Sequence, residues 1–221
     1  MPTVRVWDLP TRLFHWLLLL AVVTMIVTAK LGGNWMEWHL LLGPAVLALL
    51  AFRVLWGLVG AHWSRFASFA YGPSALLDYL RGRAPLTHRV GHTPLGALSV
   101  YGLLLVLLLQ VGSGLISDDE IAFMGPLVRW VPGAWVSQAT EYHKHIGQYL
   151  LYGLVAMHLL ALLAYRVLKK QNLVAAMVHG DKTVEGTVPA SADRASTRAA
   201  GLLVFVLALL ASYGLVSWAA Q

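Results

Sequence analysis

The residues of this chain most able to do chemistry are its histidines, nine of them in a sequence that is 58% hydrophobic and only 12% charged. Several lie in or at the ends of long apolar segments, where an ionisable side chain is costly without a partner. His158 lies deep inside one such segment, so an unpartnered imidazole there would be expensive. Each of the others, taken alone, is also compatible with an interfacial histidine. The candidate functional residues are therefore His15, His39, His143 or His145, and His158.

These histidines form two pairs if consecutive apolar segments cross a membrane in alternate directions. His15 is then level with His158, and His39 is level with His143 or His145. Facing side chains in the core of a helical bundle commonly hold a cofactor. An iron porphyrin accepts two imidazoles, whereas zinc needs further ligands that neither level offers. The pairs predict two b haems, and the absence of cysteine excludes iron–sulfur clusters and covalently attached haem.

Helical phase favours His143 over His145 as the partner of His39. At about 100° per residue, His143 lies roughly 60° from the face of His158, and His145 lies roughly 140° from it. A local adjustment of the helix near Gly147 or Gly153 would improve the alignment. The axial rise from His143 to His158 is about 22 Å, which suits electron transfer between two stacked porphyrins. His145 is then a neighbour of the haem, near a propionate.

Five apolar segments are long enough to cross a bilayer, since about 20 residues suffice. A soluble domain carries about 25% charged residues, about twice the share found here. No small-residue cleavage site follows the first segment, so we expect a retained helix rather than a signal peptide. The segments cover residues 14–31, 39–60, 95–116, 146–165 and 200–219.

The sequence thus predicts an all-α membrane protein. Its expected fold is a four-helix transmembrane haem-binding bundle followed by a fifth, C-terminal transmembrane helix. The expected division is a dihaem domain over 1–178, a polar cytoplasmic linker over 179–198 and the last helix over 199–221. Thr93 and Pro94 are typical of a helix start, and a short surface helix is expected after Pro73. An amphipathic stretch over residues 4–8 is expected to precede the first transmembrane helix.

The positive charge is explained by membrane topology rather than by nucleic acid. With the N-terminus inside, every Lys and Arg except Lys30, Arg129 and Lys144 falls on inside segments or near their helix ends. This bias predicts an orientation with the N-terminus in and the C-terminus out. A transporter is disfavoured, because the first three spans offer almost no polar groups between their ends.

Several motifs resemble the bacterial cytochrome b561 / Ni-Fe-hydrogenase-type cytochrome b family, and the similarity extends over residues 4–185. This family usually spaces the two histidines of its fourth helix by 14 residues, whereas position 144 here is Lys; Glu141 followed by His143 fits the family's acidic-x-His pattern. The matching stretches are residues 6–16, His39 with Gly43, residues 52–60, Arg65-Phe66, residues 91–96, residues 141–143, His158 and residues 171–177.

The resemblance implies b-haem ligands at His15, His39, His143 and His158, in a multi-pass protein of the bacterial inner membrane. It also implies electron transfer between membrane quinone and a periplasmic partner, either a c-type cytochrome or a redox enzyme subunit. The chain would be an electron carrier or a quinone oxidoreductase. Alternatives within the resemblance are a superoxide-oxidising quinone reductase and the membrane-anchor subunit of a hydrogenase-like complex.

Three arginines near inside helix ends are candidates for pairing with haem propionates, because a buried carboxylate needs a cationic or hydrogen-bonding partner. The simpler alternative is that each is only a positive-inside charge. They are Arg12, Arg53 and Arg65.

Overall fold

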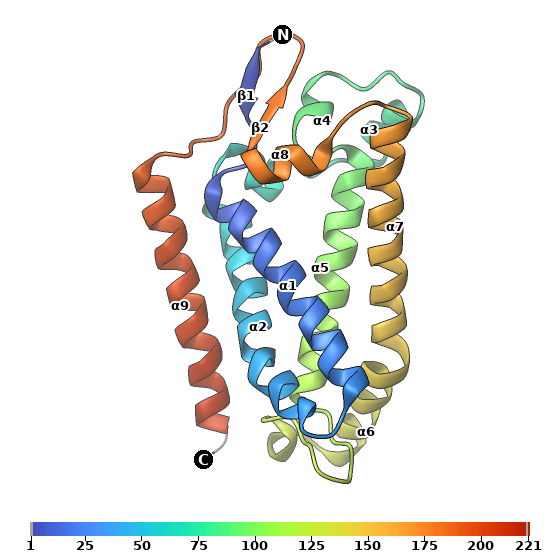
Figure 1. The fold of residues 1–221 in the computed structure, drawn as a ribbon, viewed down its shortest axis with the longest axis vertical. Coiled ribbons are helices and arrows are strands. Elements are labelled where there is room, and N and C mark those ends of the chain that lie inside the picture. Colours follow the sequence, from blue (N-terminus) through green and yellow to red (C-terminus); the bar gives the residue numbers. More distant parts are fainter. Residues whose placement is uncertain (1, 220) are drawn as a thin grey trace. The chain divides into compact units, whose positions relative to one another are not determined.

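The computed structural model describes residues 2–219 and residue 221, and most of them are helical (Figure 1). Within these residues five helical segments are long and apolar enough to cross a membrane, which confirms the predicted multi-pass helical membrane fold. These segments are α1 (Leu9–Leu31), α2 (Trp35–Val59), α5 (Pro94–Leu115), the run Gly133–Val167 and α9 (Ala195–Ala219).

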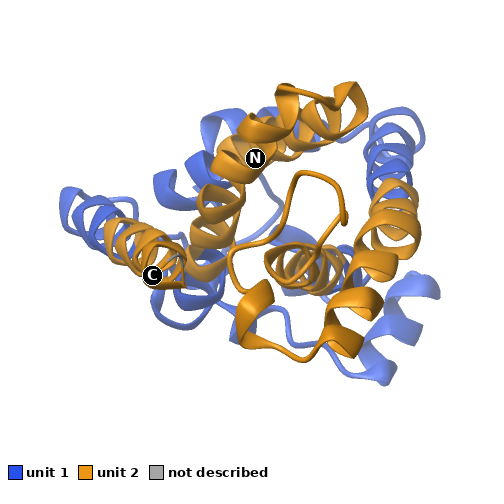
Figure 2. Cartoon of the chain, turned by 90° about the horizontal axis from the view of Figure 1, so that it is seen from below, with its two compact units in different colours: residues 1–14, 53–102, 154–204 blue, residues 15–52, 103–153, 205–221 orange. Residues whose placement is uncertain are grey.

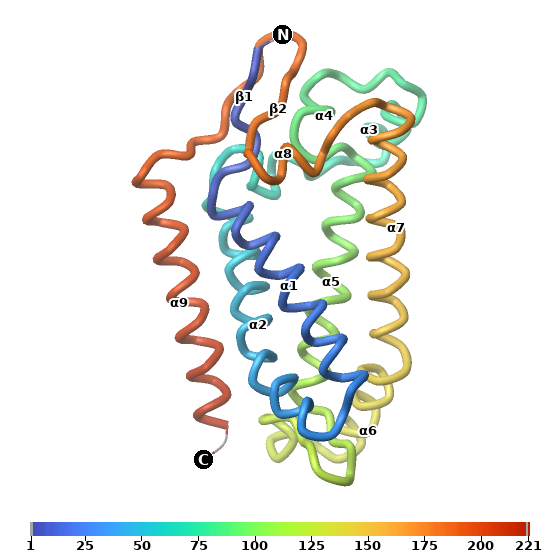
Figure 3. Tube along the Cα trace, viewed as in Figure 1, coloured from blue at the N-terminus to red at the C-terminus, as the bar shows by residue number. Residues whose placement is uncertain are grey.

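The fourth segment, labelled α6 and α7 in Figure 3, is one uninterrupted helical run. Its helix type changes along its length. It consists of α6 (Gly133–Glu141), a π-helix η4 (Tyr142–Gly147) and α7 (Gln148–Val167). The predicted adjustment near Gly147 is therefore confirmed. The helical run begins at Gly133, thirteen residues before the apolar segment expected over 146–165, because the turns over 133–141 are too polar for an apolar window to detect.

Short elements connect the long helices. The predicted helix after Pro73 is confirmed, and Thr93 caps α5 as expected, since its Oγ1 accepts the Gly96 amide at 3.1 Å. The short elements are β1 (Thr3–Arg5), η1 (His62–Ser64), η2 (Phe66–Ser68), α3 (Pro73–Leu80), α4 (Thr87–Val90), η3 (Val128–Trp130), α8 (Leu173–His179) and β2 (Asp181–Thr183).

The chain divides into two compact units, coloured separately in Figure 2, and each long helix contributes residues to both. Unit 1 contains residues 1–14, 53–102 and 154–204, and unit 2 contains residues 15–52, 103–153 and 205–221.

In unit 1, α1 begins at Leu9, earlier than its apolar window suggested. Asp8 caps it by accepting the Thr11 amide at 2.9 Å. The same buried carboxylate accepts hydrogen bonds from the Trp56 indole at 3.1 Å and from the Ser64 hydroxyl. Asp8 is 0% exposed, and these bonds explain how an acidic side chain is tolerated there.

The expected linker over 179–198 packs against the N-terminal residues in unit 1. β2 pairs antiparallel with β1, with Val4 opposite Lys182, so two short strands join an otherwise helical fold. Trp63 donates its indole N–H to the Pro189 carbonyl at 2.8 Å. A small apolar cluster forms beneath this segment from Val6, Trp7, Trp63, Val90, Ala176 and Val184.

In unit 2, α9 packs against α2. The rings of Phe52 and Phe205 are 6.1 Å apart, and the Tyr213 hydroxyl donates to the Leu41 carbonyl at 3.3 Å. Trp218 stacks on Trp130 at 4.6 Å. The fifth helix is thus held by aromatic contacts.

Candidate haem-binding site

Two of the sequence-predicted histidines lie close together in unit 2. His39 lies in the second turn of α2 and His143 in the π-helix η4. Their ring centroids are 6.2 Å apart and their planes are nearly perpendicular, at 87°. The two side chains therefore converge on one place from helices that are far apart in the sequence.

Both imidazoles are held through the same nitrogen. His39 Nδ1 lies 2.9 Å from the Met25 carbonyl oxygen in α1, and His143 Nδ1 lies 2.8 Å from the Gln110 carbonyl oxygen in α5. A carbonyl oxygen can only accept, so Nδ1 carries the proton in each ring. Nε2 is left with the lone pair that a metal ligand needs, the arrangement typical of metal-binding histidines.

The separation of the two rings would allow both imidazoles to bind one metal ion. An imidazole nitrogen binds a transition metal at about 2.0 Å, and the ring centre lies about 1.1 Å behind it, so ligands on opposite sides have centroids roughly 6 Å apart. The observed value is 6.2 Å. Residues 2–219 and 221 contain no group of three or more His, Cys, Asp and Glu side chains able to hold a metal. A porphyrin iron needs only two protein ligands, so this donor set fits haem.

Small and polar residues position His143. A Cβ at Gly114 of α5 would lie 2.8 Å from Cε1 of the His143 ring, so only glycine allows this approach. Gln110 Nε2 donates to the His143 carbonyl at 3.0 Å. That backbone carbonyl lies inside the π-helix, where the local change of pitch alters the hydrogen-bonding pattern.

Buried polar atoms next to this pair lack partners within the protein. Gln110 Oε1 and the Tyr142 hydroxyl are both buried without a hydrogen bond to any described residue. Both side chains lie against Gly147, where a Cβ would overlap them. Buried polar groups are normally satisfied, so such atoms are expected where a bound group completes the site. Sequence reasoning missed Gln110, although a glutamine amid the leucines of an apolar span was a usable signal.

His145 lies elsewhere on the π-helix. Its side chain is 63% exposed, and its Nε2 is 4.0 Å from Glu141 Oε2. Of the two histidines weighed as the partner of His39, the structure brings only His143 to its imidazole.

The other predicted pair is divided between the units. His158 lies partly buried in the part of α7 that belongs to unit 1. His15 belongs to unit 2, where its ring meets Trp16 edge-on at 5.2 Å. The pairing of His15 with His158 stays a prediction.

Arg53 is the one predicted arginine that is deeply buried, at 3% exposure. Its guanidinium lies 4.7 Å from the Phe66 ring centroid, and Nη1 donates to the Ser64 carbonyl at 3.2 Å. Nη2 is buried and has no hydrogen-bond partner among the described residues. A buried cationic donor of this kind suits a carboxylate brought by a cofactor.

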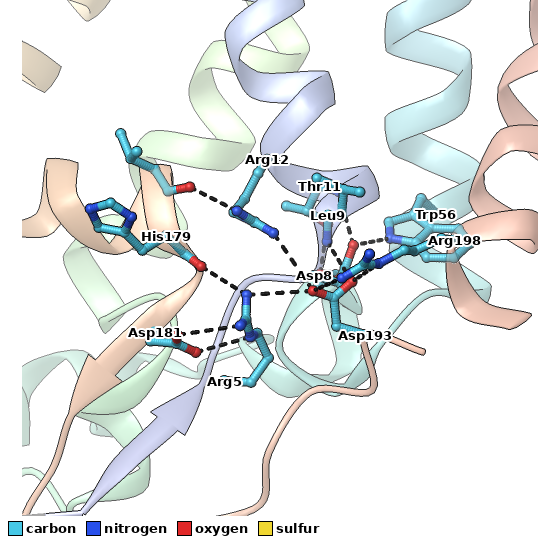
Figure 4. A network of polar contacts seen from close by, with 12 residues as sticks. Arg5, Asp8, Leu9, Thr11, Arg12, Trp56, His179, Asp181, Asp193 and Arg198 are labelled. Atoms are coloured by element: carbon cyan, nitrogen blue, oxygen red, sulfur yellow. Dashed lines mark hydrogen bonds and ion pairs between the residues drawn. The ribbon is translucent and has the colours of Figure 1, made fainter. Parts of the chain in front are cut away.

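Arg12 and Arg65 differ from Arg53. Arg12 donates to the Val178 carbonyl at 2.7 Å and lies 3.6 Å from Asp193, within the polar network of Figure 4. Arg65 is exposed. Arg12 Nε is also buried without a hydrogen-bond partner among the described residues, so propionate pairing stays a prediction for these arginines.

Comparison with known proteins identifies the family of this chain. A family model described as prokaryotic cytochrome b561 matches residues 6–180. A protein of Bradyrhizobium diazoefficiens named probable Ni/Fe-hydrogenase B-type cytochrome subunit is 24% identical over 215 residues, covering 82% of this chain and 86% of its own length. A protein of the same name from Cupriavidus necator is 26% identical over 211 residues, covering 80% of this chain and 86% of its own length. No solved structure matches.

The matched region includes each of the four predicted histidine positions and the first four membrane-spanning segments. It ends before α9, which supplies no histidine. The chain therefore belongs to the prokaryotic cytochrome b561 family, and it is a membrane-bound b-type cytochrome that acts in electron transfer.

Proposed function

We propose that this cytochrome carries two b haems and passes electrons across the membrane between a periplasmic redox partner and quinone. The observation that carries the proposal is the close approach of His39 and His143, which would hold one haem iron between them. We propose His15 and His158 as the ligands of the second haem, and Arg53 as the partner of a haem propionate.

A bound b haem supplies one-electron redox chemistry, and the protein supplies ligation, burial and charge. At the first site, the Met25 and Gln110 carbonyls orient the two imidazoles and make their Nε2 atoms better donors. The surrounding apolar helices limit access of water.

At the second site, the proposed role of Arg53 is to offset a carboxylate charge inside the membrane. Its stacking on Phe66 and its bond to the Ser64 carbonyl hold the guanidinium in one place. The free Nη2 then needs a partner, because an unsatisfied buried donor is costly.

A hydrogenase is the periplasmic partner that the comparisons favour. Both relatives are named as B-type cytochrome subunits of a Ni/Fe-hydrogenase, and the alignments cover 86% of each. By this proposal the chain anchors a hydrogenase-like subunit and conveys its electrons to quinone.

The quinone step is tested with the purified, haem-loaded protein reduced by dithionite and freed of excess reductant. Adding a short-chain ubiquinone or menaquinone should oxidise the haems within the mixing time of a rapid-kinetics experiment, as followed by the haem absorbance. A redox-inactive quinone analogue is the control. If neither quinone oxidises the haems faster than buffer does, the quinone-linked function is wrong.

A further inference from the structure

An arginine-lined cleft lies in unit 1 where the chain enters α9. It is shallow and widely open to its surroundings, with a volume of about 450 Å³. Its lining is Arg5, Ala190, Ser191, Ala192, Asp193, Arg194 and Arg198. No part of it touches the histidines described above.

The cleft carries more positive than negative charge. Asp193 is its single acidic residue, and it lies 3.1 Å from Arg198 Nε and 3.4 Å from Arg5 Nη1 (Figure 4). Arg5 is also paired with Asp181 at 2.9 Å. The Arg194 side chain makes no hydrogen bond or ion pair with any described residue, and it is exposed. One guanidinium is thus free, and a second, on Arg198, remains 50% exposed.

The charged residues continue into an apolar stripe on the same helix. Arg194, Arg198 and Leu202 are spaced by four residues, so they lie on one side of the helix in successive turns. The Arg194 carbonyl accepts the Arg198 amide at 3.0 Å, which places Arg194 at the cap of α9. Leu202 and its neighbour Leu203 are 64% and 60% exposed. The two arginines lie where they could contact a phospholipid headgroup, and the exposed leucines that follow them lie where they could contact its acyl chain.

We propose that this cleft binds the headgroup phosphate of an anionic phospholipid, with an acyl chain along Leu202 and Leu203. A guanidinium offers paired donors that match the oxygens of a phosphate. Basic pockets beside transmembrane helices, on the side where Lys and Arg accumulate, favour anionic headgroups over zwitterionic ones.

The test uses the full-length, haem-loaded protein, purified in detergent and stripped of bound lipid. Native mass spectrometry then counts lipids bound from dioleoylphosphatidylglycerol or dioleoylphosphatidylcholine at equal concentration. We expect binding of the first, little binding of the second, and no competition by inorganic phosphate. Arg194→Gln should weaken phosphatidylglycerol binding about fivefold, since one cation near an anionic membrane surface contributes about that factor.

The matched control is Arg166→Gln, because Arg166 is likewise an exposed arginine near the end of a membrane-spanning helix. Its phosphatidylglycerol binding should equal that of the unmodified protein, and haem content should be unchanged in both variants. Equal loss in both variants would mean that general surface charge, not this cleft, attracts the lipid. Equal binding of phosphatidylcholine, full competition by phosphate, or no loss in Arg194→Gln would each overturn the proposal.

Discussion

At the residue scale, the geometry of His39 and His143 depends on backbone groups that no sequence motif encodes. Each Nδ1 donates to a carbonyl oxygen of another helix, from Met25 and from Gln110. The sequence could predict the histidines, because an ionisable residue in an apolar span is conspicuous. It could not predict which carbonyls orient them, since every residue carries the same carbonyl and only packing selects one.

A substitution at Gly114 tests whether haem binding depends on the orientation of the His143 ring. In Gly114→Ala the added Cβ would lie 2.8 Å from His143 Cε1 and 3.2 Å from its Nδ1, so the ring must move and its bond to Gln110 is disturbed. We expect the haem content to fall from two to about one per chain. Alanine favours a helix over glycine by roughly 0.5–1 kcal/mol, so a general loss of helix stability is not the reason.

The control for that variant is Gly112→Ala in the same helix. Nothing lies within 4 Å of a Cβ at Gly112, and this residue is exposed. Its haem content, measured as the haem-to-protein ratio from a haemochrome spectrum, should stay at two. Equal haem content in both variants would show that the close approach at Gly114 has no part in haem binding.

At the element scale, the π-helix η4 explains how this chain departs from the usual histidine spacing of its family. A π-turn holds one more residue than an α-turn, and such turns often occur at functional sites. The extra residue between His143 and His158 agrees with a π-helix over Tyr142–Gly147. Phase reasoning predicted that an adjustment was needed, but an apolar pattern cannot distinguish α from π geometry over six residues.

The segment over 179–198 was harder to predict than any helix. Its composition is polar, and its order comes from partners more than 100 residues away, such as Arg5 with Asp181 and Trp63 with Pro189. Contacts between residues so far apart in the sequence cannot be predicted from the local sequence around either residue. The start of α1 was missed for a related reason, since Asp8 is an effective cap whose burial depends on Trp56 and Ser64.

Asp193 joins this segment to α1 and α9, and it gives a pH dependence. Burial opposes its ionisation, but hydrogen bonds from Arg198 and the Leu9 amide, with the charges of Arg198 and Arg5, outweigh it and lower the pKa of Asp193 from its ordinary value. Because the pKa of Asp193 is lower in the folded than in the unfolded protein, its ionised carboxylate stabilises the fold. This stabilisation is complete above the ordinary carboxyl pKa and is lost as the pH falls through the folded-state pKa. Asp193→Asn should lower the melting temperature at pH 7. The difference in melting temperature between this variant and the unmodified protein should become smaller below about pH 4.

Tryptophan fluorescence in detergent measures both melting curves between pH 3 and pH 8, a range wide enough to include the ordinary carboxyl pKa of about 3.9. The matched control is Asp78→Asn, which removes an ion pair with Arg83 that is largely exposed, so it should change the melting temperature little at any pH. A difference for Asp193→Asn that stays constant down to pH 3 would contradict the role given to its carboxylate.

At the scale of the whole molecule, the sequence predicted the five spans because bilayer thickness imposes a simple length and polarity rule. Their ends were less predictable: α2 starts at Trp35 and the fourth span at Gly133, where tryptophan and small polar residues lower the local apolarity. The fifth helix lies beyond the family match, contributes no histidine, and packs on α2 through Phe52 and Phe205. The inward orientation of the N-terminus stays a prediction from charge.

The most direct test of the account is the number of haems bound by the full-length protein, measured with its histidine variants. We expect two b haems per chain in the unmodified protein, about one in His143→Ala and about one in His158→Ala. His145→Ala, the matched control two residues from His143, should retain two, because its side chain is exposed beside Glu141. A single haem or none in the unmodified protein, or equal losses in His143→Ala and His145→Ala, would contradict the account.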